Sequence, residues 1–207
     1  MSDSERAIPI YERAAAALAE QYETDGTGAD ILSLVPAAGP GATALDVGAG
    51  SGRDAAALAG LGYRVTAAEP AAAMRAEAMR RHGGAAIEWI DDRLPALDAV
   101  TRAGLAFDLV LVSAVWHHVA PADRADALAA LARLTRPGGR LAMTLRLGPA
   151  PAGQPVFAVS AEEVERLARP LGLATVERRD EPDPLGRTGI AWTSLCLERS
   201  GAPAGAG

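Results

Sequence analysis

The sequence predicts an α/β domain built on a parallel sheet whose two faces are covered by helices. Five β-like runs alternate with three segments of helical spacing between residues 42 and 147, and this alternation is typical of parallel sheets. The run Asp-Leu-Val-Leu-Val at 108–112 is apolar after its first residue, as expected for a strand buried on both faces. Of the 207 residues, 49% are hydrophobic, which is enough for one domain with a sizeable core.

The elements of the first three quarters of the chain follow from periodicity and from breaker residues. A helix is predicted over 8–22, before the sheet. In a later helix, Leu128, Leu131 and Leu134 recur on one face, and Pro-Gly-Gly at 137–139 marks its stop. The expected strands are 42–47, 64–68, 86–90, 107–114 and 140–147, and the helices between them are 53–61, 71–82 and 123–135.

After residue 147 the pattern changes to a loop, a helix and a hairpin. The loop at 148–155 is rich in Pro and Gly, and Ser160 with Glu163 three residues later has the spacing of a capping box. Two β runs, 174–178 and 191–198, are joined by a long connection. We therefore expect one domain over residues 31–199, a helical cap of the same domain over 1–30 and a flexible tail over 200–207.

Composition excludes several classes of function. The formal net charge is −6, which disfavours a protein that grips a nucleic-acid backbone by charge. The single cysteine, Cys196, excludes an intramolecular disulfide and a multi-cysteine metal cluster, and we expect no metal site. The longest apolar run, 107–120, is too short and too polar to span a bilayer. Acidic residues near the N-terminus disfavour a signal peptide, so we expect a cytoplasmic protein without a membrane partner.

The strongest local signal is Leu-Asp-Val-Gly-Ala-Gly-Ser-Gly-Arg-Asp at 45–54, which follows the first strand and opens a helix. Glycines there permit a tight turn and close approach of a ligand to backbone N–H groups at the helix N-terminus. Glu69 ends the second strand, and its carboxylate can accept hydrogen bonds from both hydroxyls of a ribose. Arg53 stands where a dinucleotide fingerprint has its third glycine. Together these features indicate a nucleoside-bearing cofactor; the alternative is a plain turn with a solvated glutamate.

Five ordered motifs between residues 40 and 147 resemble those of the class I S-adenosylmethionine-dependent methyltransferases. They are DVGAGSG at 46–52, VTAAEP at 65–70, IDDRLP at 90–95, FDLVLVS at 107–113 and RPGGRL at 136–141. The resemblance implies a three-layer Rossmann-like methyltransferase fold, with a mostly parallel seven-stranded sheet and an antiparallel last strand. It also implies S-adenosyl-L-methionine as the cofactor and S-adenosyl-L-homocysteine as its product.

The resemblance implies roles for individual residues on the cofactor side. Asp46 would lie near the ammonium group of the methionine portion, and Glu69 would hold the ribose hydroxyls. Asp91 or Asp92 would receive the adenine amino group, with Asp91 slightly favoured because it directly follows a strand. Ser113 would lie beside the methionine carboxylate and the reacting methyl. The cofactor-binding candidates are Asp46, Gly48, Ala49, Gly50, Glu69, Asp91, Asp92 and Ser113.

Residues after the fourth strand are candidates for the acceptor side, because open α/β sheets place their sites at the C-terminal ends of strands. A histidine with a pKa near neutrality could deprotonate the acceptor before methyl transfer, and we favour His117 over His118 for that role. The alternative is a structural histidine bonded to backbone carbonyls. The substrate-binding candidates are Tyr11, Trp116, His117, Arg146 and Arg187, with Tyr22 and Trp192 as further possibilities.

We therefore predict methyl transfer to a small-molecule acceptor by in-line displacement, carried out by a monomer or a homodimer. The alternatives are a tRNA or protein methyltransferase and a noncatalytic S-adenosylmethionine-binding protein. A nicotinamide-dependent oxidoreductase is disfavoured, since the chain contains no lysine for a catalytic Tyr/Lys pair.

Overall fold

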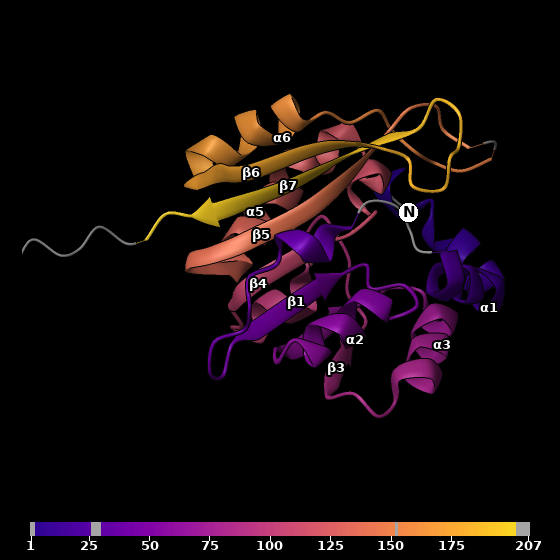
Figure 1. Ribbon diagram of the computed structural model, residues 1–207, viewed down its shortest axis with the longest axis horizontal. Coiled ribbons are helices and arrows are strands. Elements are labelled where there is room, and N and C mark those ends of the chain that lie inside the picture. Colours follow the sequence, from indigo (N-terminus) through magenta and orange to yellow (C-terminus); the bar gives the residue numbers. More distant parts are fainter. Residues whose placement is uncertain (1–2, 26–29, 152, 202–207) are drawn as a thin grey trace, which may run out of the picture.

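The computed structural model describes residues 3–25, 30–151 and 153–201, and it consists of a seven-stranded sheet between layers of helices (Figure 1). The strand order is β3-β2-β1-β4-β5-β7-β6. Strand β7 runs antiparallel to both of its neighbours, and the other adjacent strands are paired in parallel. This confirms the predicted three-layer α/β fold with a mostly parallel sheet and an antiparallel last strand.

The strands are β1 (Thr43–Val47), β2 (Arg64–Ala68), β3 (Ile87–Ile90), β4 (Phe107–Val112), β5 (Thr135–Leu147), β6 (Leu173–Pro182) and β7 (Ala191–Arg199). The α-helices are α1 (Ile8–Asp25), α2 (Arg53–Gly60), α3 (Ala72–His82), α4 (Asp98–Arg102), α5 (Arg124–Leu134) and α6 (Ala161–Ala168). Short 3₁₀ helices lie at Asp3–Glu5, Ile31–Leu34, Trp116–His118, Pro121–Asp123 and Arg169–Leu171. Each element predicted from the sequence is present, whereas α4 and the 3₁₀ helices were not predicted.

Strand β4 separates two apolar cores. Val110 and Val112 face the core that α5 and α6 cover, while Leu109 and Leu111 face the core under α2 and the 3₁₀ helix Ile31–Leu34. Successive side chains of a strand point to opposite faces, so a strand in the middle of a three-layer fold must be apolar at nearly every position. This is the pattern that the sequence shows.

Strand β5 begins earlier than predicted. Phe107 of β4 pairs with Thr135 and Leu109 pairs with Arg140, so extra residues of β5 bulge out between these two pairs. The bulge contains Pro137 and Gly138, which has a φ of 77°. The Pro-Gly-Gly segment therefore ends α5 as expected, but it lies within a bulged strand and not before one.

Asp108 ties together the N-terminal ends of three neighbouring strands. Its Oδ2 accepts hydrogen bonds from Thr43 N at 2.8 Å, from Thr43 Oγ1 at 3.0 Å and from Arg136 Nη1 at 2.7 Å. This network accounts for an acidic residue inside an apolar strand, because two donors come from β1 and one from β5, the two neighbours of β4. Helix α6 has the predicted cap, since Ser160 Oγ accepts a hydrogen bond from Glu163 N.

The N-terminal helix α1 packs on α3 beyond the C-terminal end of β1 (Figure 1). Ala15 and Ala19 of α1 pack against Met74 of α3 and against Ala71, the residue just before α3. Within the described part of the chain, no helix is both long and apolar enough to cross a membrane. Most of the expected tail, residues 202–207, lies outside the described residues, as do residues 26–29 between α1 and the sheet.

Removing a leucine from the α5 core should destabilise the fold far more than removing one from the surface. Leu131 is fully buried, and Leu61 after α2 is 48% exposed. We expect Leu131→Ala to lower the free energy of unfolding by about 2–5 kcal/mol and Leu61→Ala by less than about 1 kcal/mol. Urea denaturation followed by circular dichroism measures both; equal losses would contradict the packing described for α5.

Candidate active site

A cavity of about 270 Å³ lies between α1 and the C-terminal ends of β1, β2 and β4. Its volume is near the lower end of the range for small-molecule sites. The cavity brings together most of the residues that the sequence nominated, namely Tyr11, Tyr22, Asp46, Gly48, Ala49, Gly50, Glu69, Ser113, His117, Arg146, Arg187 and Trp192. It does not include Asp91, Asp92 or Trp116.

The glycine-rich loop between β1 and α2 forms one wall of the cavity. Gly48 has a φ of 69°, and a Cβ atom there would lie 2.5 Å from Val115 Cγ2, so packing requires this glycine. Gly50 has a φ of 55°, and a Cβ atom there would meet nothing closer than the Tyr22 ring at 3.9 Å. The absence of a side chain at Gly50 therefore leaves backbone open to a ligand.

Glu69 is held at the end of β2 by two backbone hydrogen bonds. Its Oε2 accepts from Gly50 N at 2.9 Å, and its Oε1 accepts from Ala71 N at 2.8 Å. Burial raises the pKa of this carboxyl, and the two N–H donors oppose that shift. Each carboxylate oxygen can accept more than one hydrogen bond, so Glu69 is fixed in place while both oxygens can still receive ligand hydroxyls.

Two buried oxygen atoms of the cavity lining have no hydrogen-bond partner in the described residues. They are Asp46 Oδ2, at the end of β1, and Ser113 Oγ, directly after β4. Burial raises the pKa of Asp46 well above its usual value, and the nearby carboxylates of Asp54 and Glu69 raise it further. Leaving such groups unpaired costs free energy, so this end of the cavity is suited to a ligand that carries a positive charge and hydrogen-bonding groups.

The acidic doublet after β3 is arranged differently from the other cofactor candidates. Asp92 accepts hydrogen bonds from Arg93 N and Val100 N, both at 2.9 Å, and so fixes the turn that leads into α4. The Asp91 side chain is 58% exposed and pairs with Arg75 at 3.1 Å. Its other oxygen, Oδ1, lies 3.8 Å from Arg93 Nη1, and the contact of Asp91 with adenine stays a prediction.

Tyr11 and His118 form a hydrogen-bonded pair beside the cavity. His118 Nδ1 lies 3.0 Å from Pro155 O and His118 Nε2 lies 3.0 Å from Tyr11 Oη. A carbonyl can only accept, so Nδ1 carries the proton and Nε2 accepts the proton of the Tyr11 hydroxyl. Burial lowers the pKa of His118, which keeps the ring neutral. His118 therefore orients the Tyr11 hydroxyl.

His117 lines the same cavity without such bonds. Its ring packs 4.3 Å from the His118 ring and 6.4 Å from the Trp192 ring, and its Nδ1 is buried with no partner in the described structure. Burial lowers the pKa of His117 well below its usual value, and His118 and Arg146 contribute to the shift. The expected near-neutral pKa is thus not what this environment produces, and the ring is neutral at physiological pH.

Trp116 is a correction to the sequence-based assignment. We expected it among the substrate-binding residues, but its side chain is fully buried in the apolar core next to α5 and does not line the cavity. The 3₁₀ turn Trp116–His118 directs consecutive side chains apart, so the histidines reach the cavity and the tryptophan enters the core. Gln154 and Val156, from the loop after β5, line the cavity and were missed.

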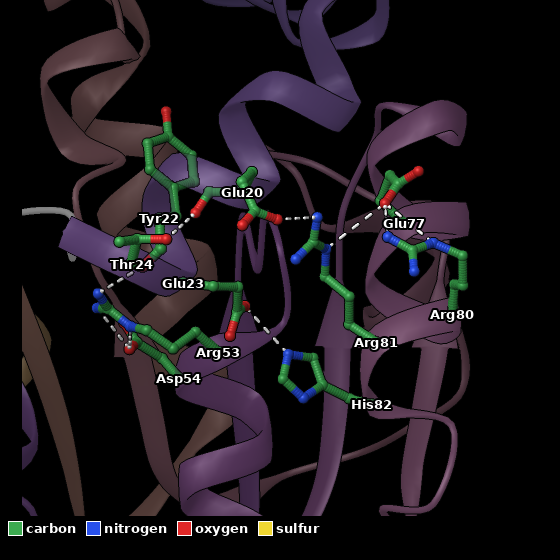
Figure 2. A network of polar contacts seen from close by, with 10 residues as sticks. All are labelled: Glu20, Tyr22, Glu23, Thr24, Arg53, Asp54, Glu77, Arg80, Arg81 and His82. Atoms are coloured by element: carbon green, nitrogen blue, oxygen red, sulfur yellow. Dashed lines mark hydrogen bonds and ion pairs between the residues drawn. The ribbon is translucent and has the colours of Figure 1, made fainter.

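Polar contacts join the C-terminal half of α1 to α3 and to the start of α2 (Figure 2). Arg81 of α3 pairs with Glu20 at 2.9 Å, and His82 lies 3.1 Å from Glu23. Arg53, the first residue of α2, donates to the backbone carbonyl of Tyr22 at 3.2 Å. These contacts place the Tyr22 ring next to Gly50, so α1 covers the part of the cavity where the glycine backbone is open.

Residues 45–143 match the protein family described as methyltransferase domain. This segment runs from β1 into β5 and contains the glycine loop, Glu69 and Ser113. This segment, just under half of the chain, is therefore similar to a methyltransferase domain.

Two curated relatives of this domain are ubiquinone biosynthesis O-methyltransferases. The protein from Methylocella silvestris is 40% identical over 95 residues, which are 46% of this chain and 36% of that protein. The protein from Methylobacterium sp. (strain 4-46) is 37% identical over 112 residues, 54% of this chain and 43% of that protein. The chain therefore covers less than half the length of either relative.

A solved structure extends the similarity in fold to nearly the whole chain. The 1,6-didemethyltoxoflavin-N1-methyltransferase of Burkholderia thailandensis, with bound 1,6-didemethyltoxoflavin and S-adenosylhomocysteine, superposes with a TM-score of 0.63. It is 23% identical, and the match covers 94% of this chain and 91% of that one. At this identity the likeness establishes a shared fold.

The lowered pKa of His117 makes stability depend on pH. Below a pH of about 6.5, His117 binds a proton in the unfolded chain but stays neutral in the folded protein. The free energy of unfolding therefore falls as the pH falls. We expect His117→Gln to lose about 1.4 kcal/mol less than the wild type between pH 7.5 and 5.5. Urea denaturation at each pH measures this difference. The raised pKa values of Asp46 and Glu69 affect stability in the opposite direction, but they do so in both proteins and cancel in the comparison. Parallel pH profiles for the two proteins would contradict the assignment.

Proposed function

We propose that this protein is an S-adenosylmethionine-dependent methyltransferase that transfers a methyl group in line to a small-molecule acceptor. The observation that carries the proposal is one cavity in which the open backbone at Gly50 adjoins two buried, unpartnered oxygens, Asp46 Oδ2 and Ser113 Oγ. A ligand with a nucleoside at one end and an amino acid at the other matches these groups. The methyltransferase family match over 45–143 supports the same conclusion.

The residues present fit this cofactor group by group. Glu69 would accept hydrogen bonds from the ribose hydroxyls, since both of its oxygens are held in place by backbone N–H groups. Asp46 would pair with the ammonium group, which would give its buried carboxylate the hydrogen-bonding partner that Oδ2 lacks in the described residues. Ser113 would donate to the methionine carboxylate, and Asp91 is proposed for the adenine amino group. S-adenosylmethionine, when bound, supplies a methyl group on a positively charged sulfur.

The acceptor side of the cavity is suited to alignment and to removal of one proton. The Tyr11 hydroxyl is oriented by His118, and the neutral His117 ring can accept a hydrogen bond or a proton from an acceptor. Helix α1 excludes water from above, held by its contacts to α3. Holding two reactants in place in this way is a large part of catalysis for a donor that is already activated.

A small-molecule acceptor is favoured by the confined volume of the cavity beneath α1. The relatives from Methylocella and Methylobacterium are named for ubiquinone biosynthesis, and the Burkholderia enzyme holds 1,6-didemethyltoxoflavin. The net charge of −6 disfavours tRNA as an acceptor. Labelled methyl transfer into small metabolites, with none into tRNA or protein, is the expected outcome; no transfer into any pool would support a noncatalytic binding protein instead.

The Glu69 carboxylate provides the first test of the cofactor site. Glu69→Ala should weaken binding of S-adenosylhomocysteine by about 1.5–3 kcal/mol, the range for hydrogen bonds to a charged group. Isothermal titration measures the affinity, and Glu88→Ala, at an exposed position of β3, is the matched control that should bind normally. An affinity of Glu69→Ala within twofold of the wild type would remove Glu69 from the site.

His117 should contribute to turnover and not to binding of the cofactor. If the acceptor loses a proton, His117→Ala should lower kcat by ~10²–10⁴-fold and leave the affinity for S-adenosylhomocysteine unchanged. The acid limb of the wild-type rate profile should lie below a pH of about 6.5, because the pKa of His117 is lowered. Glu88→Ala, at an exposed position of β3, is the control that should turn over at the wild-type rate. Normal turnover by His117→Ala would leave alignment as the main contribution of the protein.

A further inference from the structure

Arg146 is a buried cation at the end of β5 with almost no compensation from the protein. Its residue is 8% exposed and lines the cavity. Its one hydrogen bond to the described protein runs from Nη1 to the Pro149 carbonyl at 3.0 Å, and no described carboxylate lies within ion-pair distance. The other two guanidinium nitrogens, Nε and Nη2, have no partner in the described residues, and neither is one of the inaccessible atoms that lack a partner. The Nε and Nη2 edge is therefore accessible.

Asp183 is the acidic residue that affects the pKa of Arg146, and its carboxylate already accepts hydrogen bonds from other residues. Asp183 accepts from Arg187 N and Nε, both at 2.9 Å, from Arg187 Nη2 at 2.6 Å and from Trp192 Nε1 at 2.8 Å. Asp183 and Arg187 thus neutralise one another, and four donors use the acceptor sites of the carboxylate. Burial lowers the pKa of Arg146, Arg187 lowers it further, and Asp183 opposes them weakly. The charge of Arg146 stays uncompensated.

Another buried arginine shows how this protein satisfies such a charge elsewhere. Arg124 in α5 is 3% exposed, and its Nη1 pairs with Glu163 Oε2 at 2.5 Å. Its Nε and Nη2 donate to the carbonyls of Val119 and Ala158. Every side of that guanidinium has a partner, as burial of a charge requires. Arg146 differs from Arg124 in having one open edge and in facing a cavity.

The lining of the cavity also carries opposite charges over different strands. Asp46, Asp54 and Glu69 form an acidic end beside β1 and β2, with Arg53 among them, whereas Arg146 lies at the end of β5, on the other side of β4. The acidic end suits a cationic methyl donor. The opposite sign at the Arg146 end suits a ligand of opposite charge, and the attraction between the two ligands would favour their simultaneous binding.

We propose that the methyl acceptor carries a carboxylate that pairs with Arg146; this inference rests on the proposed function. The free Nε and Nη2 edge matches the two oxygens of a carboxylate in a bidentate pair. Trp192 lies opposite Arg146 in the β5–β7 register, and His117 packs against Trp192. The Trp192 ring provides an apolar surface beside the charge, so the acceptor is a compact organic acid and not a neutral molecule.

Matched acid and amide pairs test this inference, with the protein saturated by S-adenosylhomocysteine. The probes are benzoate against benzamide, 4-hydroxybenzoate against 4-hydroxybenzamide, and sarcosine against sarcosinamide. We expect the acid of at least one pair to bind about tenfold or more tightly than its amide. In Arg146→Gln the preference should fall to within twofold, and Arg146→Lys should retain part of it. Arg140→Gln, on the same strand but paired with Glu198, should keep it in full.

The outcomes separate this inference from the proposed function. If the wild type binds S-adenosylhomocysteine but prefers the acid in no pair, or if Arg146→Gln keeps the preference, the carboxylate inference is overturned and the proposed function is untouched. If the wild type does not bind S-adenosylhomocysteine at all, the proposed function fails and the inference fails with it. The affinity of each variant for S-adenosylhomocysteine reports on its folding, and the wild-type comparison stands even if a variant does not fold.

Discussion

The parallel register of β1 with β2 and β4 is the constraint on which the rest of the structure depends. It brings the C-terminal ends of three strands to one edge, so the residues that follow them, Gly48, Glu69 and Ser113, become neighbours although they are far apart in the sequence. The Gly48 N–H donates to Ala68 O at 2.7 Å, and Gly50 N donates to Glu69. The loop after β1 is therefore attached to the end of β2, and the sheet itself shapes the end of the cavity that we propose for the cofactor.

The site holds polar groups that a core selected for stability alone would not contain. Asp46 Oδ2, Ser113 Oγ and His117 Nδ1 are buried without partners in the described residues, and Arg146 carries an uncompensated charge. Each of these costs free energy in the ligand-free protein. Buried polar groups without partners are tolerated more readily at functional sites. Four such groups line this cavity, and Trp116 Nε1 and Ser194 Oγ are further examples away from it.

Sequence reasoning recovered what depends on periodicity and order, and missed what depends on side-chain direction. The residue pattern alone predicts the apolar strand β4, the glycine loop and the position of Glu69 at the end of β2. The direction of Trp116 into the core depends on a 3₁₀ turn that no periodicity marks. Tyr11 meets His118 across 107 positions of the chain, and the occupancy of Asp183 by Arg187 decides the state of Arg146. Such pairings are set by tertiary packing, which a pattern along one sequence does not contain.

The division between the matched and unmatched parts of the chain corresponds to the two ends of the cavity. Residues 45–143 hold Asp46, Gly50, Glu69 and Ser113, the groups proposed for the cofactor. Tyr11 precedes this segment, and Arg146, Arg187 and Trp192 follow it. A shared domain can therefore keep its donor site while α1, the loop after β5 and the β6–β7 connection change the acceptor. For this reason the acceptor must be inferred from the charges of those surrounding elements, and Arg146 is the charge there that the described protein leaves open.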